Sequence, residues 1–278
     1  NINIPAGITS ISESAFSDCH ELATICIPST VQSIGNKAFL NCYSLSAITI
    51  PSSVKSIGEY AFCRCYCLKS FIIPVNVTEI AYHTFDSCYM LKSVVIPQGV
   101  VSIGPYAFNN CTNLKSVGIP SNVTSIGASA FDFCSQLNSI AIPLGITTIL
   151  ECTFRACRKL KTISIPPNVI TIENDAFRVC VDLTSVSISS NLKMIGENAF
   201  DHCHNLSTIT ITSTEIELNN PLLSDFRLNT SSLNSLSGKQ SFAKFLQHIL
   251  GQNANLEISV LSPEIVHDDS NLSISSHS

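Results

Sequence analysis

The sequence has few charged residues and no long apolar run. Only 13% of its 278 residues are charged and 45% are hydrophobic, which argues against disorder for most of the chain. The net charge of -5 gives no reason to expect nucleic-acid binding, which needs a basic face. Proline, serine and threonine interrupt every apolar stretch before it reaches about 18 residues, so the sequence contains no candidate membrane span.

Motifs for catalysis are missing as well. Neither a nucleophile elbow nor a His-Glu-x-x-His motif occurs in the chain. The outward positions of the predicted strands carry mostly serine, threonine and alanine, with no charged pair suited to acid–base work. We therefore expect neither an enzyme nor a bound cofactor.

What the chain does contain is a repeat of 23 residues. Prolines that follow isoleucine recur at this interval: Pro5, Pro28, Pro51, Pro74, Pro97, Pro120, Pro143 and Pro166. Ser189 and Thr212 continue the count where proline is absent, which gives a partial unit at 1–4 and nine full repeats at 5–211. A fixed period of this length predicts a solenoid in which each unit packs on its neighbours.

Numbering each repeat from its proline assigns its apolar positions to elements. Positions 18, 21 and 23 have the Leu-x-x-Leu-x-Leu spacing, and two-residue alternation predicts a strand with 21 and 23 inward. The Val-x-x-Ile of positions 4 to 7 predicts a second short extended stretch, and glycine at position 8 predicts a turn. Ala-Phe-x-x-Cys-x-x-Leu has helical spacing and predicts a short turn of helix. Phenylalanine fills position 12 in all nine repeats, from Phe16 to Phe200, and should form the spine of the core.

The repeat resembles the BspA-like leucine-rich repeats, because the Ala-Phe-x-x-Cys element recurs in frame through residues 1–211. It departs from that pattern at Thr84 and Thr153, which replace alanine, and at four glycine positions: Ser12, Ala81, Leu150 and Glu173. The resemblance implies a curved solenoid of the kind found largely in surface antigens that adhere to host proteins. It implies no catalytic residues.

The ends of the chain differ from the repeats. Residues 212–238 lose the period, and apolar residues from Phe242 to Leu250 then have the spacing of an amphipathic helix. Leu256, Ile258 and Val260 alternate as a strand. We interpret 212–266 as a C-terminal cap, with a partner-docking helix as the alternative, and 267–278 as a disordered tail. Because Asn1 falls at position 20 of a repeat and no signal peptide precedes it, we expect a fragment or a late-starting gene model.

Nine of the thirteen cysteines occupy position 15, from Cys19 to Cys203. Stacked repeats would place neighbouring side chains about 4.8 Å apart and parallel, whereas a disulfide needs Cβ atoms about 3.8 Å apart and facing each other. We therefore predict a ladder of buried, reduced thiols. Cys63, Cys65 and Cys67 lack the spacing typical of zinc ligands, and His202-Cys203-His204 is equally weak as a metal motif, so we expect no metal.

Tyrosine and lysine recur at fixed surface positions in only part of the repeat array. Tyr43, Tyr66 and Tyr89 share position 16 of successive repeats, and Tyr60 and Tyr106 share position 10. The lysines of an overlapping set share position 19: Lys69, Lys92 and Lys115. Tyrosine is enriched at protein interfaces, so these six residues of positions 16 and 19 are the candidate partner-binding surface. A solvated rim without a partner is the alternative.

The sequence thus predicts a β-rich α/β solenoid, a leucine-rich-repeat array with a parallel sheet and a C-terminal cap. The predicted function is non-enzymatic protein binding, with a host matrix or surface protein as partner. The resemblance favours a cell-surface or secreted adhesin-like antigen. Thirteen cysteines without a disulfide framework favour a reducing interior, so an intracellular scaffold or regulator is the alternative.

Overall fold

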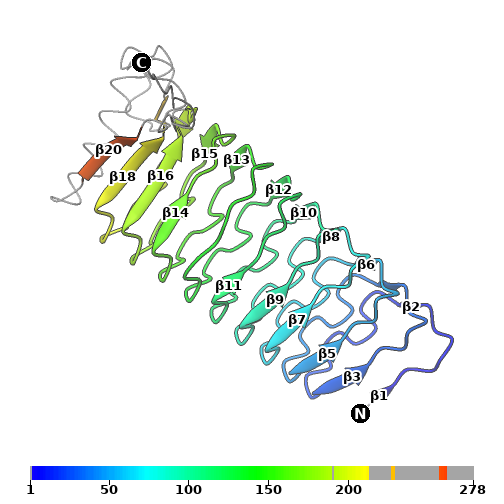
Figure 1. Ribbon diagram of the computed structural model, residues 1–278. Coiled ribbons are helices and arrows are strands. Elements are labelled where there is room, and N and C mark those ends of the chain that lie inside the picture. The colour runs from blue at the N-terminus through cyan, green and yellow to red at the C-terminus, as the bar shows by residue number, and fades with distance from the viewer. Residues whose placement is uncertain (1, 190, 213–226, 229–256, 262–278) are drawn as a thin grey trace, which may run out of the picture.

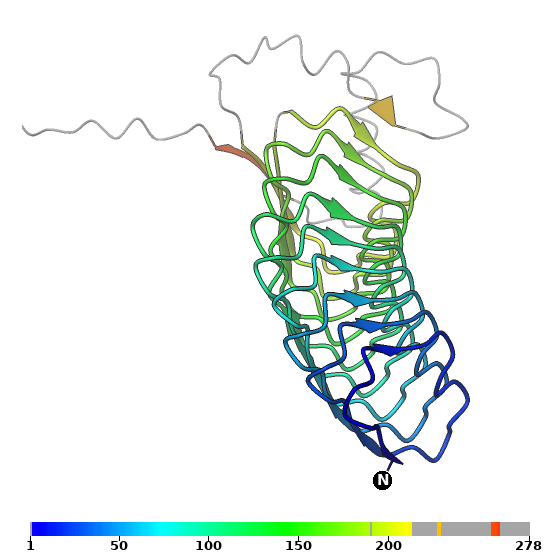
Figure 2. The same cartoon turned by 90° about the vertical axis from the view of Figure 1, so that its right-hand side faces the viewer.

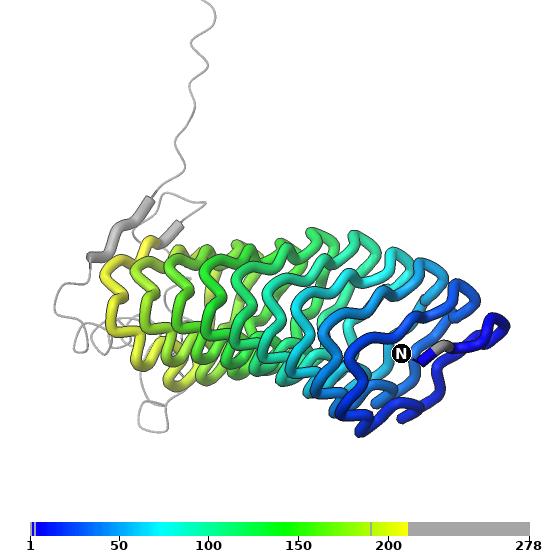
Figure 3. Tube along the Cα trace, turned by 90° about the horizontal axis from the view of Figure 1, so that it is seen from below, coloured from blue at the N-terminus to red at the C-terminus, as the bar shows by residue number. Residues whose placement is uncertain are grey.

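Each 23-residue repeat makes one turn of a parallel β-solenoid. The computed structural model describes residues 2–189, 191–212, 227–228 and 257–261. Successive turns stack into an elongated body that bends along its length (Figures 2 and 3). Two strands of each regular turn build two separate ladders along the body (Figure 1). Apolar side chains fill the space between the ladders.

The first ladder comes from positions 20 to 22 of each repeat. The strands pair in parallel within three groups, β1 to β5, β7 to β11 and β14 to β20, and paired residues of successive repeats are 23 positions apart, as in Ile25 and Ile48. The inward residue at position 21 is buried in most strands, which confirms the predicted alternation. The strands of this ladder are β1 (Ile2–Asn3), β3 (Thr24–Cys26), β5 (Ala47–Thr49), β7 (Ser70–Ile72), β9 (Ser93–Val95), β11 (Ser116–Val117), β14 (Thr162–Ser164), β16 (Ser185–Ser189), β18 (Thr208–Thr212) and β20 (Glu257–Leu261).

The second ladder comes from positions 6 and 7, as the Val-x-x-Ile spacing predicted. Its strands have only two residues each, and position 7 points into the core. They are β2 (Ser10–Ile11), β4 (Ser33–Ile34), β6 (Ser56–Ile57), β8 (Glu79–Ile80), β10 (Ser102–Ile103), β12 (Ser125–Ile126), β13 (Thr148–Ile149), β15 (Thr171–Ile172), β17 (Met194–Ile195) and β19 (Arg227–Leu228).

The segment between the two ladders is a chain of tight turns, so the predicted turn of helix is wrong. Position 10 and position 14 have positive φ in all nine repeats, for example Lys37 (57°) and Asn41 (60°). In the third repeat the N–H of Ala61 donates to Gly58 and that of Phe62 donates to Thr84 of the next repeat. Backbone N–H groups that would donate to the carbonyl four residues earlier in a helix therefore donate to the next repeat instead. Within the described residues the chain has no helix, and the fold is β-rich rather than α/β.

Glycine at position 8 has a different role from the one that we predicted. Gly58 and Gly127 have no positive φ, although each is the first residue of a turn. A Cβ atom on Gly127 would lie 2.2 Å from the backbone nitrogen of Pro105 in the preceding repeat. Close stacking of the backbones, rather than turn conformation, explains why glycine is preferred there.

The core is organised around the predicted phenylalanine spine. The rings at position 12 stack nearly parallel, and Phe85, Phe108 and Phe131 have successive centroid distances of 5.4 Å. Phe108 is fully buried. The position-15 cysteines are free, and most are buried. From Cys42 onward, each thiol donates to the carbonyl oxygen of a spine phenylalanine in the preceding repeat, as Cys65 does to Phe39 at 3.3 Å.

Two described strands lie beyond the last full repeat. β20 pairs with β18 in parallel, which confirms the strand predicted from Leu256, Ile258 and Val260. β19 extends the second ladder beside β17. The predicted helix from Phe242 to Leu250 and the predicted tail lie outside the described residues, and the boundaries of the cap stay a prediction.

Candidate functional site

A row of stacked rings runs along the surface at position 16, and we call it the ring row. It consists of His20, Tyr43, Tyr66 and Tyr89. Successive ring centroids lie 4.5, 4.7 and 4.9 Å apart. The structure therefore brings the three predicted tyrosines together, as their shared position required. His20 extends the row by one ring, which we did not predict because we counted only tyrosines.

The turn segment fixes where each ring of the row points. Position 15, directly before each ring, is a cysteine, and the cysteines before the three tyrosines are buried and bonded through their thiols to the spine. The N–H of Tyr43 donates to the carbonyl of Asn41 at 2.9 Å, and that of Tyr89 donates to Ser87 at 2.9 Å. This bond across two residues closes a tight three-residue turn. Because this turn recurs at the same position of successive repeats, the rings that follow it stack on one another.

The tyrosines of the row are partly covered. Tyr43 and Tyr66 are half-buried, and Tyr89 is 41% exposed. Burial, followed by the proximity of Tyr89 and Tyr43, raises the pKa of Tyr66 above its usual value. The phenol of Tyr66 is therefore neutral at physiological pH, and its O–H can donate to a partner.

The three predicted lysines form a second row beside the first strand ladder. Lys92 N–H donates to the Lys69 carbonyl at 2.9 Å, and Lys115 N–H donates to Lys92 at 3.4 Å, so the three residues are in register. All three side chains are exposed. In the described part of the chain, none of them makes an ion pair, and the cation–π contact found there is Arg155 over Phe133 instead. The ammonium groups thus do not sit over the tyrosine rings.

The repeat segments that carry these lysines have no acidic residue. Positions 16 to 23 of repeats two to six contain neither aspartate nor glutamate. Like charges aligned on adjacent strands repel one another. The lysine row is therefore an uncompensated line of positive charge on a protein whose net charge is negative.

A second aromatic cluster, centred on His83, was not predicted from the sequence. His83 at position 10 is stacked between Tyr60 (4.7 Å) and Tyr106 (4.5 Å), and Tyr82 meets His83 edge-on at 4.1 Å. His83 Nδ1 also lies 2.7 Å from a carboxylate oxygen of Asp86. The shared position of Tyr60 and Tyr106 was visible in the sequence, and His83 falls at the same position of the repeat between them.

The cysteine motifs do not assemble a metal site. The thiol of Cys65 donates into the core, whereas Cys63 Sγ lies 4.0 Å from Asp86. Cys203 likewise donates to the carbonyl oxygen of Phe177 in the core. The described residues hold one cluster of possible ligands, Glu151, Cys152 and Asp175.

That cluster is a poor cation site. Burial raises the pKa of the Cys152 thiol to about 11, which disfavours the thiolate that binds metals. A guanidinium nitrogen of Arg178 lies 3.4 Å from Asp175 Oδ1 and already neutralises that carboxylate. The chemistry of this set does not point to a bound ion.

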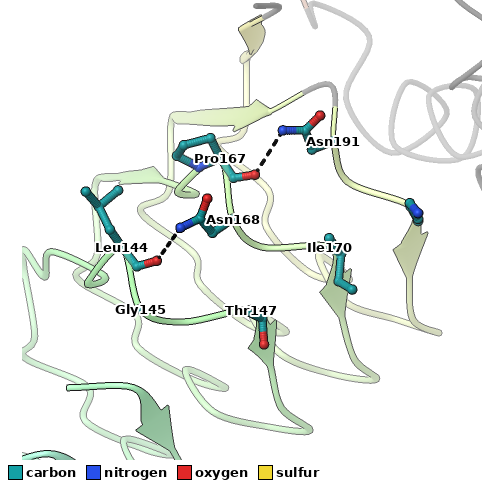
Figure 4. A pocket seen from close by; sticks show the side chains of 8 residues that line it. Leu144, Gly145, Thr147, Pro167, Asn168, Ile170 and Asn191 are labelled. Atoms are coloured by element: carbon teal, nitrogen blue, oxygen red, sulfur yellow. Dashed lines mark hydrogen bonds between the residues drawn. The ribbon is translucent and has the colours of Figure 1, made fainter. Parts of the chain in front are cut away.

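The surface also has a shallow hollow near the second ladder. Figure 4 shows it between the turns that lead to β13 and β15, with Leu144, Thr147 and Ile170 on its walls. The side-chain amides of Asn168 and Asn191 donate to the carbonyls of Leu144 (2.8 Å) and Pro167 (3.2 Å) of the preceding repeat. Since these amides stitch neighbouring turns together, their role here is structural.

Comparison with known proteins identifies the architecture. The family model for the BspA type leucine rich repeat region matches residues 1–115 and 101–229 in six copies. The chain belongs to the BspA-type leucine-rich-repeat family. No curated protein matches it. Within the described residues, no helix has the length and apolar character needed to cross a bilayer.

Solved leucine-rich-repeat structures are similar to this chain. One is a leucine-rich repeat protein from Bacteroides ovatus, with 29% identity and a TM-score of 0.57. That match covers 70% of this chain and 64% of the Bacteroides protein, so the chain spans less than two thirds of that relative. A leucine-rich repeat protein from Eubacterium ventriosum has 23% identity, a TM-score of 0.51 and coverage of 94% and 72%, which supports the fold.

Proposed function

We propose that this chain is a non-enzymatic protein-binding module and that the ring row with the lysine row is its binding surface. The observation that carries the proposal is the combination of stacked tyrosines with uncompensated lysines in repeats two to five. Tyrosine offers broad amphipathic contact area and loses little side-chain entropy on binding. Aligned ammonium groups favour an acidic partner and speed its encounter.

We further propose a cell-surface or secreted, adhesin-like role with a host matrix or surface protein as partner. This step rests on the family resemblance, because the fold alone does not determine function. The free thiol ladder favours the second candidate, an intracellular scaffold or regulator that uses the same surface. Antibody staining of intact and permeabilised cells separates the two. Staining that requires permeabilisation would contradict the surface role.

The binding surface is tested by replacing Tyr43, Tyr66 and Tyr89 together with serine and measuring binding to immobilised extracellular-matrix proteins. Ser135 already occupies position 16 of repeat six, so the fold accepts serine there. The affinity should fall by about a hundredfold, equivalent to nearly 3 kcal/mol for three interface tyrosines.

The matched control removes tyrosines from another row. Tyr60 and Tyr106 are replaced by serine, which position 10 already carries at Ser14 and Ser129. This control should keep its affinity, and both variants should keep a cooperative melting transition. Unchanged binding by the folded triple variant would show that the ring row is a solvated rim that does not contact the partner.

A further inference from the structure

The outward face of the first ladder carries an apolar ridge beside the lysine row. The ridge consists of Ile72 at the end of β7 and Val95 at the end of β9, which pair directly in the parallel register. Ile72 is 69% exposed and Val95 is 58% exposed. Large hydrophobic side chains on a strand surface usually lie against another layer, and in the described part of the chain nothing covers these two.

The ridge ends abruptly at the next repeat. Position 22 is glycine at residue 118 and alanine at residue 141, and a Cβ added to Gly118 would meet no atom within 4 Å. The β9–β11 pairing includes Ser93–Ser116 and Val94–Val117 but stops before Gly118. The ladder then continues through a single bridge, Ser116–Ser139, before β14 pairs with β16.

A shallow groove occupies this interruption. Its lining includes the outward side of Gly118, Ala141 and Ser164, and exposed Leu144 borders it farther along the body. Figure 1 shows the gap between the arrows of β11 and β14. The ridge and the groove together form a step: two bulky apolar side chains stand beside an opening where side chains are small or absent.

Each lysine at position 19 lies three residues before the residue at position 22 of the same repeat. Lys69 precedes Ile72, Lys92 precedes Val95, and Lys115 precedes Gly118. The positive row therefore runs along one side of the step. The absence of aspartate and glutamate from positions 16 to 23 of repeats two to six leaves this charge to be matched by a ligand.

We infer that the step is the specificity-determining centre of the binding surface, and that its occupant is an acidic polypeptide segment with bulky apolar side chains. This inference rests on the proposed function. The carboxylates of the segment would face Lys69, Lys92 and Lys115. One apolar side chain would pack against Val95 and enter the space above Gly118, because that space is open and its neighbour is apolar.

The key test is Gly118→Val, which removes no group from the protein. Gly118 does not have a positive φ, and the site has room for a side chain, so the melting temperature should stay the same or rise. The new side chain would occupy the space that the partner needs. A random peptide library selected on the wild-type protein should yield peptides that combine acidic with bulky apolar residues. Gly118→Val should lower the affinity for those peptides by about tenfold or more.

Companion variants separate this inference from the proposed function. The double variant Ile72→Ser/Val95→Ser should also lose about tenfold or more in affinity. Ala141→Ser, farther along the same row, is the matched control and should bind as the wild type does. If the triple tyrosine variant loses binding while Gly118→Val and the double serine variant retain it, the inference about the step is wrong and the proposed role of the ring row is supported. If the step variants lose binding while the triple tyrosine variant retains it, the proposed role of the ring row is wrong.

Two other outcomes also overturn the inference. One is selection of peptides that lack acidic or bulky apolar residues, or enrichment of no peptide at all. The other is binding of heparin, a sulfated polysaccharide, that depends on the lysines and displaces the peptides but is unaffected by Gly118→Val. That result would identify a purely electrostatic site for an anionic glycan.

Discussion

The Cys111 thiol donates a hydrogen bond to the Phe85 carbonyl oxygen at 3.3 Å. Phe85 belongs to the preceding repeat, and its carbonyl also accepts the N–H of Cys88 at 3.2 Å. Each such cysteine therefore ties two turns of the solenoid together. This bond explains why cysteine, rather than alanine, recurs at position 15, since alanine has no donor to offer.

This relationship predicts thiol reactivity. In the native protein, a thiol reagent should modify exposed Cys26 first, and the ladder cysteines should react only after denaturation. Addition of reductant should leave the melting temperature unchanged. Mass spectrometry that found ladder cysteines joined to one another would contradict the reduced ladder.

Stability should decline in alkaline solution. Burial raises the pKa of Cys42 to about 12 and that of Cys65, Cys88 and Cys111 well above the usual value. The thiols stay neutral in the folded protein while those of the unfolded chain ionise above about pH 8.5. The unfolded state then binds fewer protons, so the free energy of unfolding falls as pH rises from about 8.5 toward 12.

Urea unfolding at several pH values between about 8 and 11 measures this slope, which should be about 1.4 kcal/mol per pH unit for each such thiol. The variant Cys111→Ala should have a slope that is smaller by the contribution of one thiol, about 1.4 kcal/mol per pH unit. A free energy of unfolding that is flat across this range would show that the thiols are not buried as described.

Truncating the spine should be costly. Phe108→Ala removes a fully buried ring from the middle of the stack and should lower the free energy of unfolding by about 3–5 kcal/mol. Phe133→Ala is the control, because Phe133 is 40% exposed and its loss should cost about 1 kcal/mol or less. A loss below about 1 kcal/mol for Phe108→Ala in equilibrium denaturation would exclude the ring from the core.

The pair Arg155–Asp132 should be strongly coupled. Asp132 is 2% exposed, and Arg155 contacts both of its carboxylate oxygens from the next repeat. Arg155→Met leaves this buried carboxylate without its cation and should cost about 3 kcal/mol, the low end for a buried pair because Arg155 is one-third exposed. Adding Asp132→Asn should restore most of the loss, as measured in a double-mutant cycle. Additive losses would contradict the pairing.

Val179 provides a gain-of-stability test. Its φ of 62° is unfavourable for a β-branched residue, whereas Asn41 and Asn110 occupy the same position of other repeats with φ of 60° and 56°. Val179→Asn should raise the free energy of unfolding by about 1 kcal/mol. A lower melting temperature for this variant would show that the side chain of Val179 contributes more by packing than its backbone conformation costs.

Much of the fold could be predicted from the sequence because period, apolar spacing and phenylalanine position are all direct consequences of stacking identical turns. The predicted turn of helix at positions 11 to 18 is wrong because position 14 within it, and position 10 just before it, have positive φ. Residues as different as Tyr60, Phe133 and Val179 adopt positive φ there, so no glycine signal marks the turns. Amide bonds between repeats override local propensity, and such bonds cannot be seen in a single repeat.

The candidate site was only partly predictable. Shared repeat positions predicted the stacking of Tyr43, Tyr66 and Tyr89, because side chains at one position lie one turn apart. The apolar step was not predicted, since Gly118 matters for the space that it leaves open and a sequence does not show empty space. His83 was missed because a histidine between two tyrosines does not repeat by residue type.

Hydroxyl-radical footprinting of the wild-type protein, with and without the matrix protein that it binds most tightly, tests the central claim most directly. Bound partner should protect Tyr43, Tyr66, Tyr89 and the exposed Met90 that follows Tyr89 from oxidation. Exposed Phe133, away from the ring row at position 14 of repeat six, should stay as reactive as before. Protection of Phe133 with unchanged oxidation of the three tyrosines would place the partner elsewhere and contradict the binding surface proposed for this solenoid.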